Sequence, residues 1–146
     1  MSVLPTADFR LWSAQHNGQF LFVSNDMAGA DHIVEAHPFG DEARNYFQAI
    51  EDADFRVRLF HPETGTFLFV SNDMAGPDHV FEAHGSVDEE RNRFEVGFSP
   101  DGQDISFFNT ATHTAMFLSN DQRGADFVIE AHVPASSEAR NLFRLV

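Results

Sequence analysis

Three copies of one unit fill this chain, and that repetition constrains its fold more than any other feature of the sequence. The copies FLFVSNDMAGADHIVEAH, FLFVSNDMAGPDHVFEAH and AMFLSNDQRGADFVIEAH carry Ser-Asn-Asp triplets that start at Ser24, Ser71 and Ser119, 47 and 48 residues apart. An Arg-Asn pair follows each copy, and a Phe comes two residues after its Asn, at Phe47, Phe94 and Phe143. We therefore expect one domain over residues 1–146, built from repeats at about 8–50, 54–98 and 104–146.

Each repeat contains four short segments with the composition of β-strands. In the first repeat they are residues 9–14, 19–24, 32–37 and 45–50, and Phe9 and Leu11 alternate there with polar Arg10. A polar turn separates the first two segments, and a longer segment with Asn-Asp and Gly, which we expect to be a loop, separates the next two. No helical periodicity extends over a useful length, so the sequence predicts twelve strands and an all-β fold.

The number of repeats selects among the all-β architectures. A propeller also uses four strands per repeat, but three blades are too few to close around a channel. A solenoid needs terminal repeats of different sequence, and none is seen. Three four-stranded units of this length resemble a β-trefoil, and the resemblance covers essentially the whole chain. It implies a six-stranded barrel that three hairpins cap around a pseudo-threefold axis.

Two short motifs show which groups of β-trefoil proteins the chain resembles and which it does not. The Gly-x-Phe-Leu start of the second strand, at residues 18–21 and 65–68, resembles the fascin and hisactophilin group, whereas the third repeat departs from it at residues 113–116. The Gln-x-Trp signature of ricin-type lectins is missing, because the only Trp is Trp12, in a first strand. The carbohydrate-contact residues of that lectin group therefore cannot be transferred to this chain.

Apolar positions that keep their bulk in the third repeat, which has diverged most, are expected to form the core. Phe is identical in all three repeats at two of these positions, and the other two exchange Leu for Met, or Val for Phe and Ile. The predicted core residues are Phe22, Phe69, Phe117, Phe47, Phe94, Phe143, Leu21, Leu68, Met116, Val34, Phe81 and Ile129.

Repeated polar residues supply the candidate ligand-binding positions. The pattern Asn-Asp-x-x-Gly-x-Asp occurs in every repeat, a Glu follows it four residues later, and a His comes two residues after the Glu. The candidates are Asn25, Asp26, Asp31, Glu35, His37, Asn72, Asp73, Asp78, Glu82, His84, Asn120, Asp121, Asp126, Glu130 and His132. An oxygen-rich loop suits Ca²⁺, but Asx turns and carboxylates that cap loop amides explain the same residues without a ligand. No repeat has the spacing of an EF-hand loop, so we expect no metal and no cofactor.

The histidines and arginines at fixed positions have simpler interpretations. Equivalent positions of a trefoil lie far apart, so we do not expect the three Glu-Ala-His histidines to share a metal. Each of them either hydrogen-bonds to loop backbone or contacts a ligand in one of three separate pockets. Arg44, Arg91 and Arg140 follow Glu42, Glu89 and Glu138 by two residues, and we expect ion pairs that fix the turn into the fourth strand. We expect the first-turn histidines His16, His61 and His113 to be solvated.

The charge of the chain excludes several classes of partner. Nine Arg and no Lys stand against 23 Asp and Glu, and the resulting formal net charge of −14 disfavours nucleic acid and anionic membrane surfaces. A high-salt environment and GC-rich codon usage both explain the missing Lys. No apolar run approaches the roughly 20 residues of a membrane span, so membrane insertion is not expected. No secretory signal peptide is visible, which leads us to expect a cytoplasmic or non-classically exported protein.

The sequence favours binding over catalysis. It contains no G-x-S-x-G, phosphate-loop or H-E-x-x-H motif, and its carboxylates repeat in every unit, whereas a glycosidase needs one asymmetric pair. We expect a non-enzymatic module with up to three equivalent sites for a carbohydrate or glycoconjugate, because weak polar sites beside Phe suit multivalent sugar binding. Two alternatives stay open: a fascin-like protein- or actin-interaction module, which the negative charge disfavours since actin is acidic, and a structural domain without a small ligand.

Overall fold

The computed structural model describes residues 4–52, 56–85, 90–133 and 139–146, and these residues form twelve strands and four short 3₁₀ helices. The first repeat contains β1 (Leu11–Ser13), η1 (Gln15–Asn17), β2 (Gln19–Ala28), β3 (Asp31–His37), η2 (Ala43–Asn45) and β4 (Gln48–Glu51). The second contains β5 (Val57–His61), β6 (Thr66–Ala75), β7 (Asp78–His84), η3 (Glu90–Asn92) and β8 (Glu95–Phe98). The third contains β9 (Ile105–Asn109), β10 (Thr114–Arg123), β11 (Asp126–His132), η4 (Ala139–Asn141) and β12 (Arg144–Leu145).

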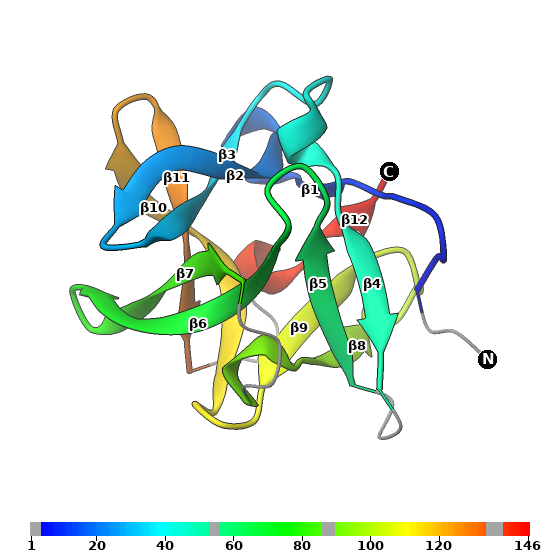
Figure 1. Ribbon diagram of the computed structural model, residues 1–146. Coiled ribbons are helices and arrows are strands. Elements are labelled where there is room, and N and C mark those ends of the chain that lie inside the picture. Colours follow the sequence, from blue (N-terminus) through cyan, green and yellow to red (C-terminus); the bar gives the residue numbers. More distant parts are fainter. Residues whose placement is uncertain (1–3, 53–55, 86–89, 134–138) are drawn as a thin grey trace.

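The first and last strands of the repeats close into a barrel. Antiparallel ladders join β1 to β12, β4 to β5 and β8 to β9. Single bridges join the remaining neighbours and complete the ring of six strands: Phe9–Phe47, Val57–Phe94 and Ile105–Phe143. The barrel strands gather on one side of the molecule and the long hairpins on the other (Figure 1).

The hairpins β2–β3, β6–β7 and β10–β11 cap the barrel and meet at the pseudo-threefold axis. Their second strands β3, β7 and β11 pair with one another, which closes a triangle around that axis. Each pairing sets a Glu of one repeat opposite a branched apolar residue of another: Glu82 opposite Ile33, Glu35 opposite Val128 and Glu130 opposite Val80. A six-stranded barrel with three capping hairpins is a β-trefoil, so the predicted all-β fold is confirmed.

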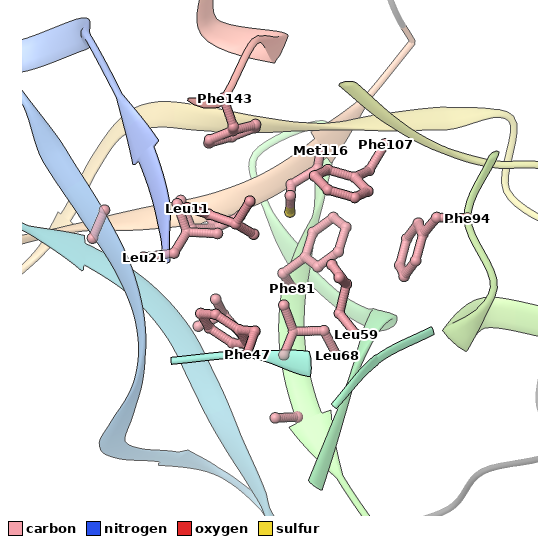
Figure 2. Packing of buried hydrophobic residues seen from close by; sticks show 14 of the residues in the cluster. Leu11, Leu21, Phe47, Leu59, Leu68, Phe81, Phe94, Phe107, Met116 and Phe143 are labelled. Carbon is pink, nitrogen blue, oxygen red and sulfur yellow. The ribbon is translucent and has the colours of Figure 1, made fainter. Parts of the chain in front are cut away.

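The predicted core residues all lie inside the fold. Phe47, Phe94 and Phe143 are completely buried and surround the centre of the barrel with Leu11, Leu59 and other residues of the same cluster (Figure 2). A second, smaller cluster of Ile33, Val80 and Val128 lies between the hairpins. The fold therefore has two apolar centres, one in the barrel and one at the axis of the cap.

The segment after each Ser-Asn-Asp triplet differs from the prediction, because it extends a strand instead of forming a loop. Strand β2 continues to Ala28, and its pairing with β3 shifts by a bulge between Val23 and Met27. The bulge frees the amide of Asp26, which donates to the Ser24 hydroxyl at 3.0 Å; the equivalent bonds from Asp73 and Asp121 measure 3.0 and 3.1 Å. Serine is thus repeated because its hydroxyl satisfies this amide.

The repeated Arg-Asn pairs hold the hairpins onto the 3₁₀ helices. Arg44 donates to the carbonyl of Val23 at 2.7 Å and to the Asn25 side chain, and Asn45 donates to the carbonyl of Leu21 at 3.1 Å. Arg91 donates in the same way to the carbonyl of Val70, at 2.9 Å. The prediction of a Glu42–Arg44 ion pair is wrong, since Arg44 satisfies backbone and amide acceptors of β2; Glu89 and Glu138, the other predicted partners, lie outside the described residues.

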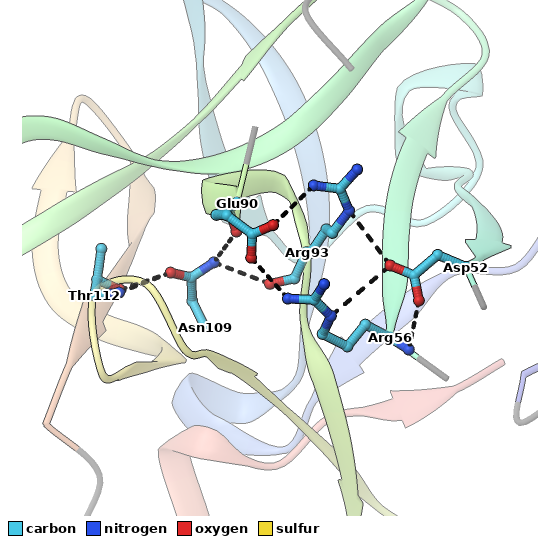
Figure 3. A network of polar contacts seen from close by, with 6 residues as sticks. All are labelled: Asp52, Arg56, Glu90, Arg93, Asn109 and Thr112. Atoms are coloured by element: carbon cyan, nitrogen blue, oxygen red, sulfur yellow. Dashed lines mark hydrogen bonds and ion pairs between the residues drawn. The ribbon is translucent and has the colours of Figure 1, made fainter. Parts of the chain in front are cut away.

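A network of ion pairs in the second repeat is connected to the third repeat by hydrogen bonds (Figure 3). Arg56 donates to Glu90 at 2.7 Å, Arg93 donates to the other Glu90 oxygen at 3.2 Å, and Asp52 lies 3.3 Å from the Arg93 guanidinium. Asn109 of β9 donates to the carbonyls of Glu90 and Arg93, both at 3.0 Å. Acidic side chains therefore do form ion pairs with Arg, but the arginines are Arg56 and Arg93, which lie outside the repeated Arg-Asn motif.

Two of the three first-turn histidines depart from the prediction of solvated side chains. His61 is fully buried, and its ring nitrogens hydrogen-bond to the Thr64 hydroxyl at 2.7 Å and to the Arg44 carbonyl at 3.0 Å. Burial lowers the pKa of His61. The ring of His16 stacks on Phe127 at 3.8 Å, whereas His113 is exposed. Among the described residues, no helix has the length and apolar character needed to cross a bilayer.

Candidate functional site

The predicted binding residues of one repeat do not converge on one loop, because neighbouring repeats share them. Glu35 lies beside Asp26 of its own repeat and is influenced by Asp126 of the third. Glu82 likewise lies beside Asp73 of its own repeat and is influenced by Asp31 of the first. Glu130 lies beside Asp121 of its own repeat and is influenced by Asp78 of the second. Each acidic cluster therefore lies at a boundary between two repeats.

The glutamates of these clusters are buried, which their position in the sequence did not reveal. Glu35, Glu82 and Glu130 are at most 1% exposed, and both Glu35 oxygens and one oxygen of each other carboxyl lack a hydrogen bond of good geometry. A buried acceptor left in this state costs about 1–3 kcal/mol. In contrast, Asp26, Asp73 and Asp121 are exposed at the outer rim of the clusters.

Burial and like charge together keep the three glutamates protonated at neutral pH. Burial, followed by the adjacent carboxyl of Asp26, Asp73 or Asp121, raises the pKa of Glu35, Glu82 and Glu130 to about 8, while the nearby Ser hydroxyl opposes the shift. These carboxyls are therefore hydrogen-bond donors as well as acceptors at pH 7.

Only the first acidic cluster has a cation of this chain beside it among the described residues. The Arg123 Nε atom lies 3.8 Å from Glu35 and 3.9 Å from Asp26. In the other two repeats the residue equivalent to Arg123 is an alanine, Ala28 or Ala75. The three boundaries therefore have equivalent carboxyl groups, but only the first has an arginine beside them.

The three Glu-Ala-His histidines stack on the repeated Phe of the paired strand. The ring centroids are 4.0 Å apart for His37 and Phe22, and 3.8 Å for the pairs His84–Phe69 and His132–Phe117. His132 hydrogen-bonds to the Asn141 side chain at 2.9 Å, and His37 lies 3.3 Å from Glu42. Each His covers a buried Phe, so these Phe faces are not open platforms for a ligand.

Two open pockets lie beside these stacks. One, of about 440 Å³, is lined by Gln15, Asp78, Phe117, His132, Ala139 and Arg140, so that an Asp of the second repeat faces a His of the third. The other, of about 480 Å³, is in the first repeat and is lined by Arg10, Phe20, Pro38, Phe39, Gly40, Asp41 and Glu42. Asn72 and Asn120 are exposed on β6 and β10, at the position that Asn25 occupies beside Arg44.

Phe39 distinguishes the first repeat from the others. The residue is 67% exposed, and its ring lies nearly perpendicular to that of His37, with centroids 5.5 Å apart. The sequences that follow the other two Glu-Ala-His triplets, GSVDE and VPASSE, contain no aromatic residue. Phe39 was not among the predicted binding residues, because those residues repeat in all three units; its sequence signal is an aromatic residue present in one repeat only. Within the described residues, no three His, Asp or Glu side chains are arranged to hold a metal ion.

No protein-family model matches this chain, and no curated protein is similar to it in sequence. Solved structures are similar in fold. A Caenorhabditis elegans protein of unknown function has a TM-score of 0.84 at 16% identity, covering 99% of this chain and 96% of that one. The designed 3-fold symmetric protein ThreeFoil has a TM-score of 0.79 at 14% identity, covering 95% and 97%.

A lectin is also among the similar structures. The Polyporus squamosus lectin, solved with the human-type influenza-binding epitope Neu5Acα2-6Galβ1-4GlcNAc, has a TM-score of 0.76 at 11% identity. The match covers 99% of this chain and half of the lectin chain. At such identities the similarity shows the β-trefoil fold alone.

Proposed function

We propose that this chain is a non-enzymatic binding module for carbohydrate, with its principal site in the Phe39 pocket of the first repeat. The single observation that carries the proposal is the exposed Phe39 ring beside exposed carboxylates, Asp41 and Glu42, at an open pocket of about 480 Å³. An apolar ring face packs against the C–H face of a sugar, while carboxylates accept hydrogen bonds from its hydroxyls.

Contacts around the pocket hold its walls in place before a ligand arrives. Arg10 donates to the carbonyl of Gly40 at 3.2 Å and lies over the ring of Phe20, with its guanidinium carbon 5.3 Å from the ring centroid. The Glu42 backbone amide donates to the Asn45 side chain at 3.0 Å. A pocket that is already ordered loses less entropy when a ligand binds.

The charge of the chain narrows the class of sugar. Asp41, Glu42 and the formal net charge of −14 repel anionic groups, so we propose neutral saccharides as ligands. The similarity to a glycan-bound lectin supports sugar binding only as an analogy between folds. Because the aromatic residue occurs in one repeat only, we propose one principal site, in the first repeat.

Phe39→Ala is expected to weaken binding of a neutral saccharide at least tenfold, because the variant removes the ring that would contact the sugar. A neutral-glycan array identifies the ligand, and calorimetric titration then compares the variant with the unaltered chain. The melting temperature should stay nearly constant, since Phe39 is exposed.

Phe98→Ala is the matched control, because Phe98 of β8 is also exposed, at 52%, and lies outside the pocket. Its saccharide affinity should equal that of the unaltered chain. Equal affinities for the Phe39 variant and this control would place the site elsewhere. Failure of every neutral glycan to bind at millimolar concentration would reject carbohydrate binding itself.

A further inference from the structure

A pocket of about 250 Å³ lies at the axis of the cap, away from the Phe39 pocket. Its apolar surface comes from Ile33, Val80 and Val128, the three residues of the small cluster between the hairpins. Its polar surface comes from Asp73, Glu82, Asp121, Gln122 and Arg123. The pocket therefore combines an apolar floor with carboxyl groups on its walls.

Glu82 supplies an unmet hydrogen-bond acceptor at this pocket. Its side chain is 1% exposed, it lines the pocket, and its Oε2 atom has no hydrogen-bond partner within the described residues. Native proteins satisfy nearly all such buried atoms with protein, water or ligand. The Oε2 atom of Glu82 is thus free to hydrogen-bond with a group that enters the pocket.

Arg123 shows which group the chain itself places beside an equivalent pair of carboxyls. It reaches from the third repeat to the Glu35–Asp26 pair of the first, with its Nε atom 3.8 and 3.9 Å from their oxygens. By the pseudo-threefold symmetry, the residue that would reach the Glu82–Asp73 pair is Ala28, and Ala28 lines the pocket. The chain has therefore filled one boundary with an alkylguanidinium group and left the equivalent space at another boundary open.

We propose that the axial pocket binds an alkylguanidinium group, with its cation between Glu82 and Asp73 and its alkyl chain over Ile33, Val80 and Val128. The group comes either from a small molecule or from an arginine side chain of a partner. Its charge complements the three carboxyl groups of the lining, which outnumber the one guanidinium of Arg123, and its planar donors match two carboxyl groups. This site is independent of the carbohydrate site proposed above.

The site should respond to pH because the cation favours an ionised Glu82. The groups that face Glu82 are Asp73 of β6 and Asp31 of β3, both acidic, while Arg123 of β10 lines the other side of the pocket. A bound cation would therefore release the proton of Glu82 at neutral pH. Affinity should rise severalfold between pH 6.5 and pH 8.5, and proton release should accompany binding at pH 7.

The proposal is tested by titrating the whole chain with n-butylguanidinium chloride and observing the methyl resonances of Met74, which lines the pocket. We expect saturable shifts that n-butanol and sodium chloride do not reproduce. Ala28→Arg should reduce the affinity at least tenfold, because its side chain occupies the space beside Glu82 as Arg123 does beside Glu35. Ala111→Arg adds the same charge at an exposed turn and should leave the affinity unchanged.

A Gly-Arg-Gly peptide distinguishes the two sources of the group. Tighter binding of the peptide than of n-butylguanidinium indicates a partner's arginine, and the reverse order indicates a small molecule. Glu82→Gln keeps the shape of the side chain and should abolish the pH dependence. Shifts that do not saturate, or an equal loss of affinity in Ala28→Arg and Ala111→Arg, would overturn the proposal.

Discussion

Phe94→Ala is expected to lower the free energy of unfolding by about 3–5 kcal/mol, the usual range for removing a buried Phe side chain. Phe94 is completely buried, and its ring lies 5.6 Å from Phe81 and 6.4 Å from Phe107, measured between centroids. Its backbone pairs with Val57, where the second repeat closes its part of the barrel. Loss of the ring would leave a cavity at this closure, which urea unfolding monitored by circular dichroism would measure.

The matched control for this variant is four residues along the chain. Phe98 of β8 is exposed, so Phe98→Ala should change the stability by no more than about 0.5 kcal/mol. A loss below about 1 kcal/mol for Phe94→Ala would contradict the burial of Phe94 and the alignment of the three repeats that predicted it.

The fold was predictable because the same pattern of strands and core residues occurs in all three repeats. Phe47, Phe94 and Phe143 stand at identical positions, and substitutions such as Leu21 to Met116 keep the volume of the core. These patterns depend on local periodicity and bulk, which a sequence displays directly. The repeat number then restricted the architecture to a β-trefoil.

Hydrogen bonds that replace regular pairing were not predictable in the same way. The Asn25-Asp26 segment has the composition of a loop, yet it continues β2 because the Ser24 hydroxyl accepts the amide that the bulge leaves free. His61 stands in a polar turn, yet it is buried because its ring nitrogens reach Thr64 and the Arg44 carbonyl. In both cases the deciding partner is a single atom that composition does not reveal.

Contacts between repeats limited the prediction of the candidate sites. Asp126 is four residues from Glu130 in the sequence, but in the fold it acts on Glu35 of the first repeat. Glu35 itself follows Ile33 and Val34 and precedes Ala36, and these apolar neighbours are a sequence signal for a buried carboxyl. Phe39 was missed for the opposite reason, since it interrupts the symmetry instead of repeating it.

Raising the pH from 6 to 8 is expected to destabilise the chain by about 1–2 kcal/mol for each of the three buried glutamates, or about 3–6 kcal/mol together. The folded chain raises the pKa of Glu35, Glu82 and Glu130 from 4.5 to about 8. Between these values the folded state holds protons that the unfolded state releases, so the free energy of unfolding falls as the pH rises. The stabilisation is complete below pH 4.5 and is lost as the pH passes 8.

The triple variant Glu35→Gln, Glu82→Gln and Glu130→Gln isolates the contribution of these three carboxyls from that of every other ionisable group in the chain. Gln is neutral at every pH, so the variant should melt at a higher temperature than the unaltered chain at pH 8.5 and should lose most of the slope between pH 6 and pH 8. Glu95→Gln, on the exposed face of β8, should keep the full slope. Thermal melts across pH 5–9 measure all three chains. An unchanged slope in the triple variant would show that these glutamates are already ionised at neutral pH, and that Asp73 and Glu82 present two negative charges to the axial pocket instead of one.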